Sequence, residues 1–213
     1  MKTLQHILFG FLLVNLVSIS SLANATIIDF DSITNSSTYQ IGNNTYDGLT
    51  FSSSWYILNS SSTSLQNSGY HNGTVSPSYV AYNGYGNDVS ITSATPFNFN
   101  GAYLTAAWNT GLNIKISGLL NGILAYSQTI SVNPSSPTYF DLNFNNIDML
   151  SFSSFGGTNA GLGGVGNHFA IDNFTFNETL QPSPTPEPAT MLLMGIGIAG
   201  GALMRKRMKQ SEV

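Results

Sequence analysis

The sequence contains no cysteine, and positive charge is almost absent from its interior. Of the six lysines and arginines in 213 residues, Lys2 lies near the N-terminus, four lie within the last nine residues, and Lys115 is the only one between the two ends. Because no disulfide can form, a packed core has to hold the fold. Because no basic surface exists, we expect no nucleic acid among the partners of this protein.

Charge of either sign is scarce, at 8% of residues, and the middle of the chain is acidic. Asn, Ser, Thr and Gly are frequent there, so hydroxyls and amides rather than ions hydrate the surface. Such a surface is compatible with cations and with neutral glycans. The acidic residues between positions 26 and 180 are Asp29, Asp31, Asp47, Asp88, Asp141, Asp148, Asp172 and Glu178.

The N-terminus has the pattern of a secretory signal peptide. Lys2 precedes the apolar run ILFGFLLVNLVSI, and Ala23 and Ala25 then stand in an Ala-x-Ala arrangement. This order predicts a signal peptide over residues 1–25, removed by signal peptidase, and a mature chain that begins at Thr26. The alternative is an uncleaved anchor, but the apolar run is short for a membrane span.

The C-terminus has the pattern of a membrane anchor. Residues 189–204 carry no charge and, as a helix, would extend about 24 Å, somewhat less than the ~30 Å hydrocarbon core of a bilayer. We therefore predict a transmembrane helix over 189–204, a cytoplasmic tail over 205–213, and an extended proline-rich stalk over 181–188. The basic cluster expected to stop transfer consists of Arg205, Lys206, Arg207 and Lys209.

The residues Pro186, Glu187 and Pro188 stand immediately before the predicted span. The order of this tripeptide, a short hydrophobic helix and a terminal basic cluster resembles the PEP-CTERM sorting signal of exosortase substrates. The resemblance implies an exosortase as processing partner and export across the inner membrane of a Gram-negative-type bacterium. It also implies transient anchoring, followed by a place at the cell surface or in the extracellular, biofilm and exopolysaccharide-associated matrix.

The part between the ends, residues 26–180, has the period of β-strands rather than of helices. In LNIKIS, for example, Leu112, Ile114 and Ile116 alternate with polar residues, and Asn121-Gly122 is a strong hairpin signal before the next such run. Many short strands with turn-rich connections predict an all-β, antiparallel β-sandwich. We expect a jelly-roll-like version, in which the first and last strands lie close together.

Three aspartates in two segments form a candidate calcium site. In FAIDNFTF the apolar face switches at Asp172-Asn173, which predicts a β-bulge. The opening IIDFD places Asp29 and Asp31 on one face of a strand. An acid near the start and one in the last strand resemble the structural calcium site of jelly-roll carbohydrate-binding modules, so Asp29, Asp31 and Asp172 are candidate ligands. The alternative is that these acids simply face solvent.

Aromatic residues are concentrated between positions 70 and 85, among glycines and asparagines. Aromatic faces combined with amide groups are a common means of holding sugar rings. Trp55 and Trp108 could serve in the same way, although Trp108 continues a predicted strand and so is expected to be structural. The alternative is that all these side chains pack in the core. The candidate glycan-binding residues are Tyr70, His71, Tyr79, Tyr82 and Tyr85.

Enzymatic motifs are missing from the central part of the sequence. Its one glutamate, Glu178, lies at the stalk, no Gly-x-Ser-x-Gly element occurs, and His71 and His168 have no metal-ligand spacing. We therefore expect no catalytic residues. The resemblance to exosortase substrates then implies a non-enzymatic cell-surface or matrix protein, with extracellular polysaccharide as its candidate ligand. Two alternatives stay open: a glycan-active enzyme on a jelly-roll scaffold, and a structural surface protein crosslinked by calcium.

Overall fold

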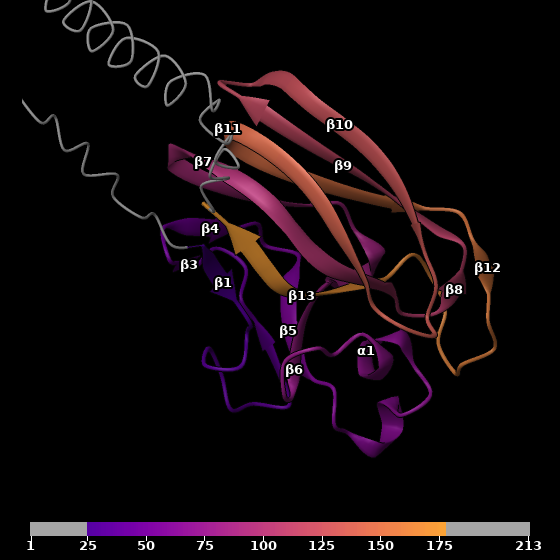
Figure 1. Cartoon of the computed structure of the whole chain (residues 1–213). Coiled ribbons are helices and arrows are strands. Elements are labelled where there is room, and N and C mark those ends of the chain that lie inside the picture. The colour runs from indigo at the N-terminus through magenta and orange to yellow at the C-terminus, as the bar shows by residue number, and fades with distance from the viewer. Residues whose placement is uncertain (1–24, 178–213) are drawn as a thin grey trace, which may run out of the picture.

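The structure is a computed structural model, and it describes residues 25–177 of the chain. These residues form strands with a few single helical turns (Figure 1). The strands are β1 (Thr26–Ile28), β2 (Thr38–Gln40), β3 (Thr45–Tyr46), β4 (Leu49–Phe51), β5 (Trp55–Asn59), β6 (Tyr79–Asn83), β7 (Val89–Ala106), β8 (Asn109–Thr110), β9 (Leu112–Leu120), β10 (Ile123–Val132), β11 (Thr138–Phe155), β12 (Thr158–Asn159) and β13 (Phe169–Phe176). The helical turns are η1 (Thr63–Leu65), α1 (Gly69–Asn72) and η2 (Gly84–Gly86).

Two long strands, β7 and β11, connect the two layers of an antiparallel sandwich. The second half of β11 and the first half of β7 lie in one layer, in the order β10-β9-β11-β7-β4-β3. The first half of β11 and the second half of β7 lie in the other layer, in the order β11-β7-β13-β6-β5-β2. A short pair, β12 with β8, stands apart from these layers (Figure 1). The predicted all-β sandwich is confirmed.

The bend of β11 lies where its register against β7 shifts. Pairing is interrupted between Asp141 and Phe144 and again between Ile147 and Met149. Asn143 and Asn146 have backbone φ angles of 50° and 55°, a left-handed conformation that asparagine tolerates better than most residues. Irregularities of this kind bend a strand and increase its twist, which allows β11 to pass from one layer into the other.

The two ends of the sandwich lie side by side, as a jelly-roll-like fold requires. β1 pairs antiparallel with β13, with Thr26 opposite Phe176. The predicted bulge in β13 is also present, because the register against β7 shifts between Asp172 and Thr175 and Asn173 has a φ of 48°. The shift lets apolar residues on both sides of the bulge face the core.

The predicted hairpin at Asn121-Gly122 is confirmed as the connection of β9 to β10. Ile123 lies opposite Leu120, and the two turn residues have φ angles of 52° and 76°. Such a two-residue turn has the twist that matches two antiparallel strands.

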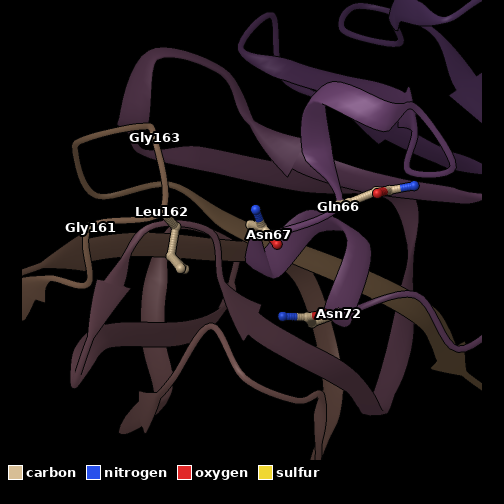
Figure 2. Close-up of a pocket in the computed structure, with 6 residues that line it drawn as sticks. All are labelled: Gln66, Asn67, Asn72, Gly161, Leu162 and Gly163. Atoms are coloured by element: carbon tan, nitrogen blue, oxygen red, sulfur yellow. The ribbon is translucent and has the colours of Figure 1, made fainter.

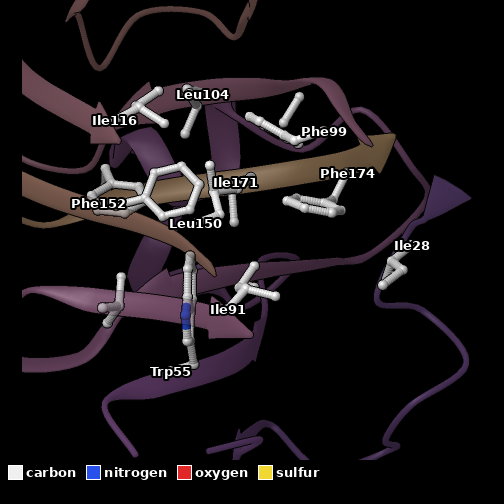
Figure 3. Close-up of a cluster of buried hydrophobic side chains, with 14 of the residues drawn as sticks. Ile28, Trp55, Ile91, Phe99, Leu104, Ile116, Leu150, Phe152, Ile171 and Phe174 are labelled. Atoms are coloured by element: carbon white, nitrogen blue, oxygen red, sulfur yellow. The ribbon is translucent and has the colours of Figure 1, made fainter. Parts of the chain in front are cut away.

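The core between the layers is built around Trp55, which is fully buried (Figure 3). Its ring lies 5.7 Å from that of Phe152 in the opposite layer and 5.9 Å from that of Phe169 in β13 of its own layer, both edge to face. Its indole N–H donates to the carbonyl oxygen of Ser90 at 3.0 Å, which satisfies the one polar group of this side chain. Trp55 is therefore a core residue and unavailable to a ligand.

The predicted signal peptide, stalk, transmembrane helix and basic tail lie almost wholly outside the described residues. Within residues 25–177 no helix is long and apolar enough to span a bilayer.

Candidate functional site

The alternation of side-chain direction along a strand decides which tyrosines face away from the core. In β6, Tyr79 and Ala81 point into the main core, whereas Val80 and Tyr82 point to the opposite, outer face of the layer. Tyr56 of β5 lies directly across from Tyr82. A second, smaller apolar cluster covers this outer face, and its buried members are Leu58, Tyr70, Val80, Ala107 and Ala170.

Five aromatic rings follow one another across this outer face. Trp108 meets Tyr70 edge to face at 5.4 Å, and Tyr70 meets Tyr82 at 5.2 Å. Tyr82 and Tyr56 are 5.6 Å apart, and Tyr56 meets Tyr85 at 6.1 Å. Contacts of this kind hold rings in fixed relative orientations. We call these five residues the aromatic row.

A cleft of about 480 Å³ opens along one end of the aromatic row. Its floor is aromatic, from Tyr70, Tyr82 and Trp108, and His168 joins them at one side. The rest of its wall carries hydroxyl and amide groups and two leucines, from Ser37, Thr38, Leu58, Asn59, Ser62, Ser64 and Leu65. None of the residues that line the cleft is acidic.

Tyr70 and His168 form the polar contact at the base of this cleft. The Tyr70 hydroxyl lies 3.0 Å from Nδ1 of His168. Burial raises the pKa of the Tyr70 phenol, so the hydroxyl keeps its proton and can donate it to Nδ1. Burial also lowers the pKa of His168, so the ring is neutral at pH 7 and its own proton belongs on Nε2. His168 therefore offers one N–H donor at the cleft.

The glycine-rich loop before β13 packs against Trp108. Gly164 lies so close to the indole that a Cβ atom at this position would overlap the ring. The backbone N–H of Ala107 donates to the carbonyl oxygen of His168 at 2.9 Å. The backbone N–H of Ala160 donates to the carbonyl oxygen of Trp108, also at 2.9 Å. These contacts fix Trp108 and His168 beside each other although 60 positions separate them in the sequence.

Only some of the predicted glycan-binding residues lie at the cleft or in the aromatic row. Tyr70 and Tyr82 line the cleft, and Tyr85, which is 81% exposed, ends the aromatic row. Tyr79 faces the core with 8% exposure and does not belong to the row. His71 is exposed, and its Nδ1 lies 3.1 Å from the carbonyl oxygen of Ser60.

Three members of the site are absent from the residues predicted for it, namely Tyr56, Trp108 and His168. Trp108 was expected to be structural because it continues β7, yet it lines the cleft and is only partly buried. Alternation along β7 could not have found it: Ala106 faces the core and Ala107 the outer face, so a continued strand would return Trp108 to the core, whereas β7 ends at Ala106.

The three aspartates of the predicted calcium site are not grouped as metal ligands in the described residues. Asp172 is fully buried, and its carboxylate accepts from the backbone N–H groups of Val75 at 2.6 Å, Ser76 at 2.9 Å and Asn173 at 2.7 Å, and from the Ser76 hydroxyl at 2.8 Å. Burial raises the pKa of this carboxyl, and the hydrogen bonds partly offset that rise. The carboxylate therefore fastens the segment before β6 to β13.

Asp31 binds the same stretch of chain a few residues further on. Its Oδ1 accepts from the backbone N–H groups of Ser78 at 3.0 Å and Tyr79 at 3.2 Å, whereas its buried Oδ2 has no hydrogen-bond partner. Asp29 is exposed, and its Oδ1 accepts from the backbone N–H of Asp31 at 3.1 Å. Across residues 25–177, no three His, Cys, Asp or Glu side chains are grouped as a metal site would require. Calcium binding stays a prediction.

Comparison with known proteins identifies the end of the chain. Residues 184–207 match the family model described as the PEP-CTERM protein-sorting motif. This stretch contains Pro186, Glu187 and Pro188, so the predicted sorting signal is confirmed. No curated protein matches the chain in sequence.

Two solved structures align with the chain at low sequence identity. A DUF4465 family protein from Bacteroides caccae matches with a TM-score of 0.50 and 13% identity, over 73% of this chain and 100% of that one. TmCBM61, solved in complex with β-1,4-galactotriose, matches with a TM-score of 0.35 and 10% identity, over 63% of this chain and 90% of that one. The chain is thus an exported, exosortase-targeted protein with a PEP-CTERM sorting motif, and its described domain is an antiparallel β-sandwich.

Proposed function

We propose that the β-sandwich is a glycan-binding domain of a cell-surface or extracellular-matrix protein. The observation that carries this proposal is the cleft of about 480 Å³ in which Tyr70, Tyr82 and Trp108 stand beside His168. Aromatic rings bind the C–H faces of sugars, and a few directed polar groups fix their hydroxyls. Both kinds of group are present here, held in place by contacts within the domain.

The position of the cleft supports a role in contacting material outside the cell. Trp108 and His168 lie near Phe169, at the start of β13, whereas β1 pairs with the other end of this strand, at Phe176, after which the sequence continues to the sorting motif. Eight residues of strand separate these ends by roughly 23 Å. A domain held at the membrane by its C-terminus would thus present the cleft outward.

We infer binding rather than hydrolysis as the activity of this cleft. Hydrolysis of a glycosidic bond ordinarily requires two carboxyl groups on either side of the scissile bond. The residues that line the cleft include no Asp or Glu. Asp172 is fully buried and bonded to the backbone of another segment, which leaves it without access to a substrate.

Binding can be tested by titrating the purified full-length protein with uncharged oligosaccharides in a calorimeter. We expect saturable binding that Trp108→Ala abolishes, because this change removes the largest ring at the cleft. Tyr103→Phe is a matched control, because Tyr103 packs against Tyr139 away from the aromatic row. Unchanged binding by the Trp108→Ala protein, shown to be folded by circular dichroism, would contradict the proposal.

The sorting motif supports a separate proposal, which concerns how the protein is processed after export. We infer that exosortase processes the chain near Pro186, Glu187 and Pro188, and that the domain then reaches the surface or the biofilm matrix. Replacing all three residues with alanine should keep the full-length chain in the membrane fraction. Replacing Pro182 and Pro184 of the stalk is the control, and release of the triple variant at the normal rate would argue against processing at the motif.

A further inference from the structure

A second hollow adjoins the cleft, and its chemistry differs. It has a volume of about 550 Å³ and lies between the segment that carries α1 and the glycine-rich loop (Figure 2). Three amide side chains and the glycine-rich loop form its wall, through Gln66, Asn67, Asn72, Gly161, Leu162 and Gly163. Figure 2 shows Leu162 facing the segment that carries Asn67 and Asn72. We call this hollow the amide groove.

The cleft and the amide groove are neighbours along two segments of the chain. Leu65 lines the cleft, and the next residue, Gln66, lines the groove. On the other side, Gly163 lines the groove, and the next residue, Gly164, lies against the Trp108 ring of the cleft. One wall thus passes from the cleft into the groove between consecutive residues, and the other connects to the cleft through the contact of Gly164 with Trp108.

The amide groove offers hydrogen-bond donors and acceptors that carry no charge. The Nδ2 group of Asn72 donates to the carbonyl oxygen of Pro134 at 2.8 Å, which holds this side chain in place and leaves its Oδ1 as an acceptor. An amide offers a donor and an acceptor side by side, a pair that suits neighbouring sugar hydroxyls. The groove therefore complements the aromatic cleft, which supplies ring faces.

The charge of the domain restricts the kind of glycan that fits. Neither hollow is lined by an Asp, Glu, Lys or Arg side chain, and burial keeps His168 neutral at pH 7 by lowering its pKa. Residues 25–177 contain seven aspartates against one lysine, Lys115, so the domain as a whole repels anions. A polymer of uronic acids would find no cation in either hollow to pair with.

We propose that the cleft and the amide groove form one extended site that binds a linear chain of several uncharged sugars, rather than a single sugar or an acidic polysaccharide. This inference rests on the proposed glycan binding at the cleft and adds the length and the charge of the ligand. Rings of the chain would lie against the aromatic floor, and the next sugars would reach Asn67 and Asn72.

The test uses purified full-length protein and calorimetric titration with oligosaccharides of one to six sugars. The probes are β-1,4-linked glucose, galactose, mannose and N-acetylglucosamine series, with oligogalacturonate as the charged comparison. We expect affinity for at least one uncharged series to rise by about tenfold or more from two sugars to six, as one or two added hydrogen bonds would give. Oligogalacturonate should bind at least tenfold more weakly.

A double variant tests whether the amide groove supplies the added affinity for the longer oligosaccharides. Gln66→Ala with Asn67→Ala should reduce hexasaccharide affinity to near that of the disaccharide and leave disaccharide affinity unchanged. Asn145→Ala, at an exposed amide of β11, is the control and should change neither. Both Gln66 and Asn67 are exposed, so the fold should tolerate their replacement.

The possible results separate this inference from the proposed function. Equal affinity for two and six sugars, no effect of the double variant on the hexasaccharide, or equal binding of oligogalacturonate would overturn the extended site. In each of these cases, loss of binding on Trp108→Ala would still support glycan binding at the cleft. Failure of every uncharged series to bind would overturn both.

Discussion

Asp172 of β13 and Ser76, in the segment before β6, are joined by two hydrogen bonds. One carboxylate oxygen accepts from the backbone N–H of Ser76 at 2.9 Å, and the other accepts from its hydroxyl at 2.8 Å. The same hydroxyl lies 3.0 Å from the carbonyl oxygen of Asp29 beside β1. Ser76 therefore links the first strand, the last strand and the segment that leads from α1 into β6.

Loss of this link should destabilise the domain. Asp172→Ala leaves the N–H groups of Val75 and Ser76 and the Ser76 hydroxyl without the carboxylate they bind, so we expect the free energy of unfolding to fall by about 3 kcal/mol. Urea denaturation of the variant and the parent measures this loss. Asp88→Ala, at an exposed aspartate, is the control and should change stability by less than about 0.5 kcal/mol. A similar small change for Asp172→Ala would contradict the role assigned to it.

His168 should make stability depend on pH below neutrality. Burial lowers its pKa in the folded state, so the unfolded chain binds the proton more readily than the folded one. As the pH falls below about 6.5, the ordinary value for histidine, the free energy of unfolding should decrease until the folded-state pKa is passed. His168→Asn should flatten this part of the profile, whereas His71→Asn, at an exposed histidine, should not. Equal slopes for the two variants would contradict the burial effect.

The two tryptophans of the chain should report on different surroundings. Trp55 is fully buried, whereas Trp108 is partly exposed at the cleft. The Trp55→Phe protein should therefore emit at longer wavelength and be quenched readily by acrylamide. The Trp108→Phe protein should emit at shorter wavelength and resist quenching. Emission spectra that coincide for the two variants would show that Trp108 is not at the surface.

Gly164 should control the exposure of Trp108. A Cβ atom at this position would overlap the indole, so Gly164→Ala should displace the glycine-rich loop. In the Trp55→Phe background we expect stronger acrylamide quenching and a loss of about 1–3 kcal/mol in stability from the overpacking. Val165→Ala is the control, because Val165 is the next residue and is 71% exposed. This change should leave the acrylamide quenching and the stability unchanged. Quenching that does not respond to Gly164→Ala would argue against the contact.

Calcium is testable at Asp31, whose buried Oδ2 lacks a hydrogen-bond partner. If a cation satisfies this oxygen, calcium should raise the Tm by several degrees over that in excess chelator, since a ligand that binds only the folded state stabilises it. Asp31→Asn should remove the calcium response, and Asp88→Asn should preserve it. Identical Tm values with calcium and chelator would rule out calcium as a structural ligand of this site.

Several local features could be predicted from short stretches of sequence because short-range chemistry dictates them. Asn121-Gly122 forms its turn because both residues accept a left-handed backbone, and the switch of apolar face around Asp172-Asn173 requires the bulge found there. The membership of the cleft could not be predicted in this way. Alternation shows that Tyr79 and Tyr82 lie on opposite faces, but both faces of this layer carry apolar residues, so the sequence does not reveal which face meets the other layer.

The sequence by itself determined the sandwich class, the hairpin and bulge positions, and the sorting signal, because each depends on residues close together in the chain. Only the tertiary structure decided that Trp108 and His168 stand beside Tyr70, and that Asp31 and Asp172 both bind the backbone of residues 75–79. The physical reason is that these neighbours are brought together by the pairing of β13 with β7 and β6. Such pairings depend on the packing of the whole core, which no local pattern encodes.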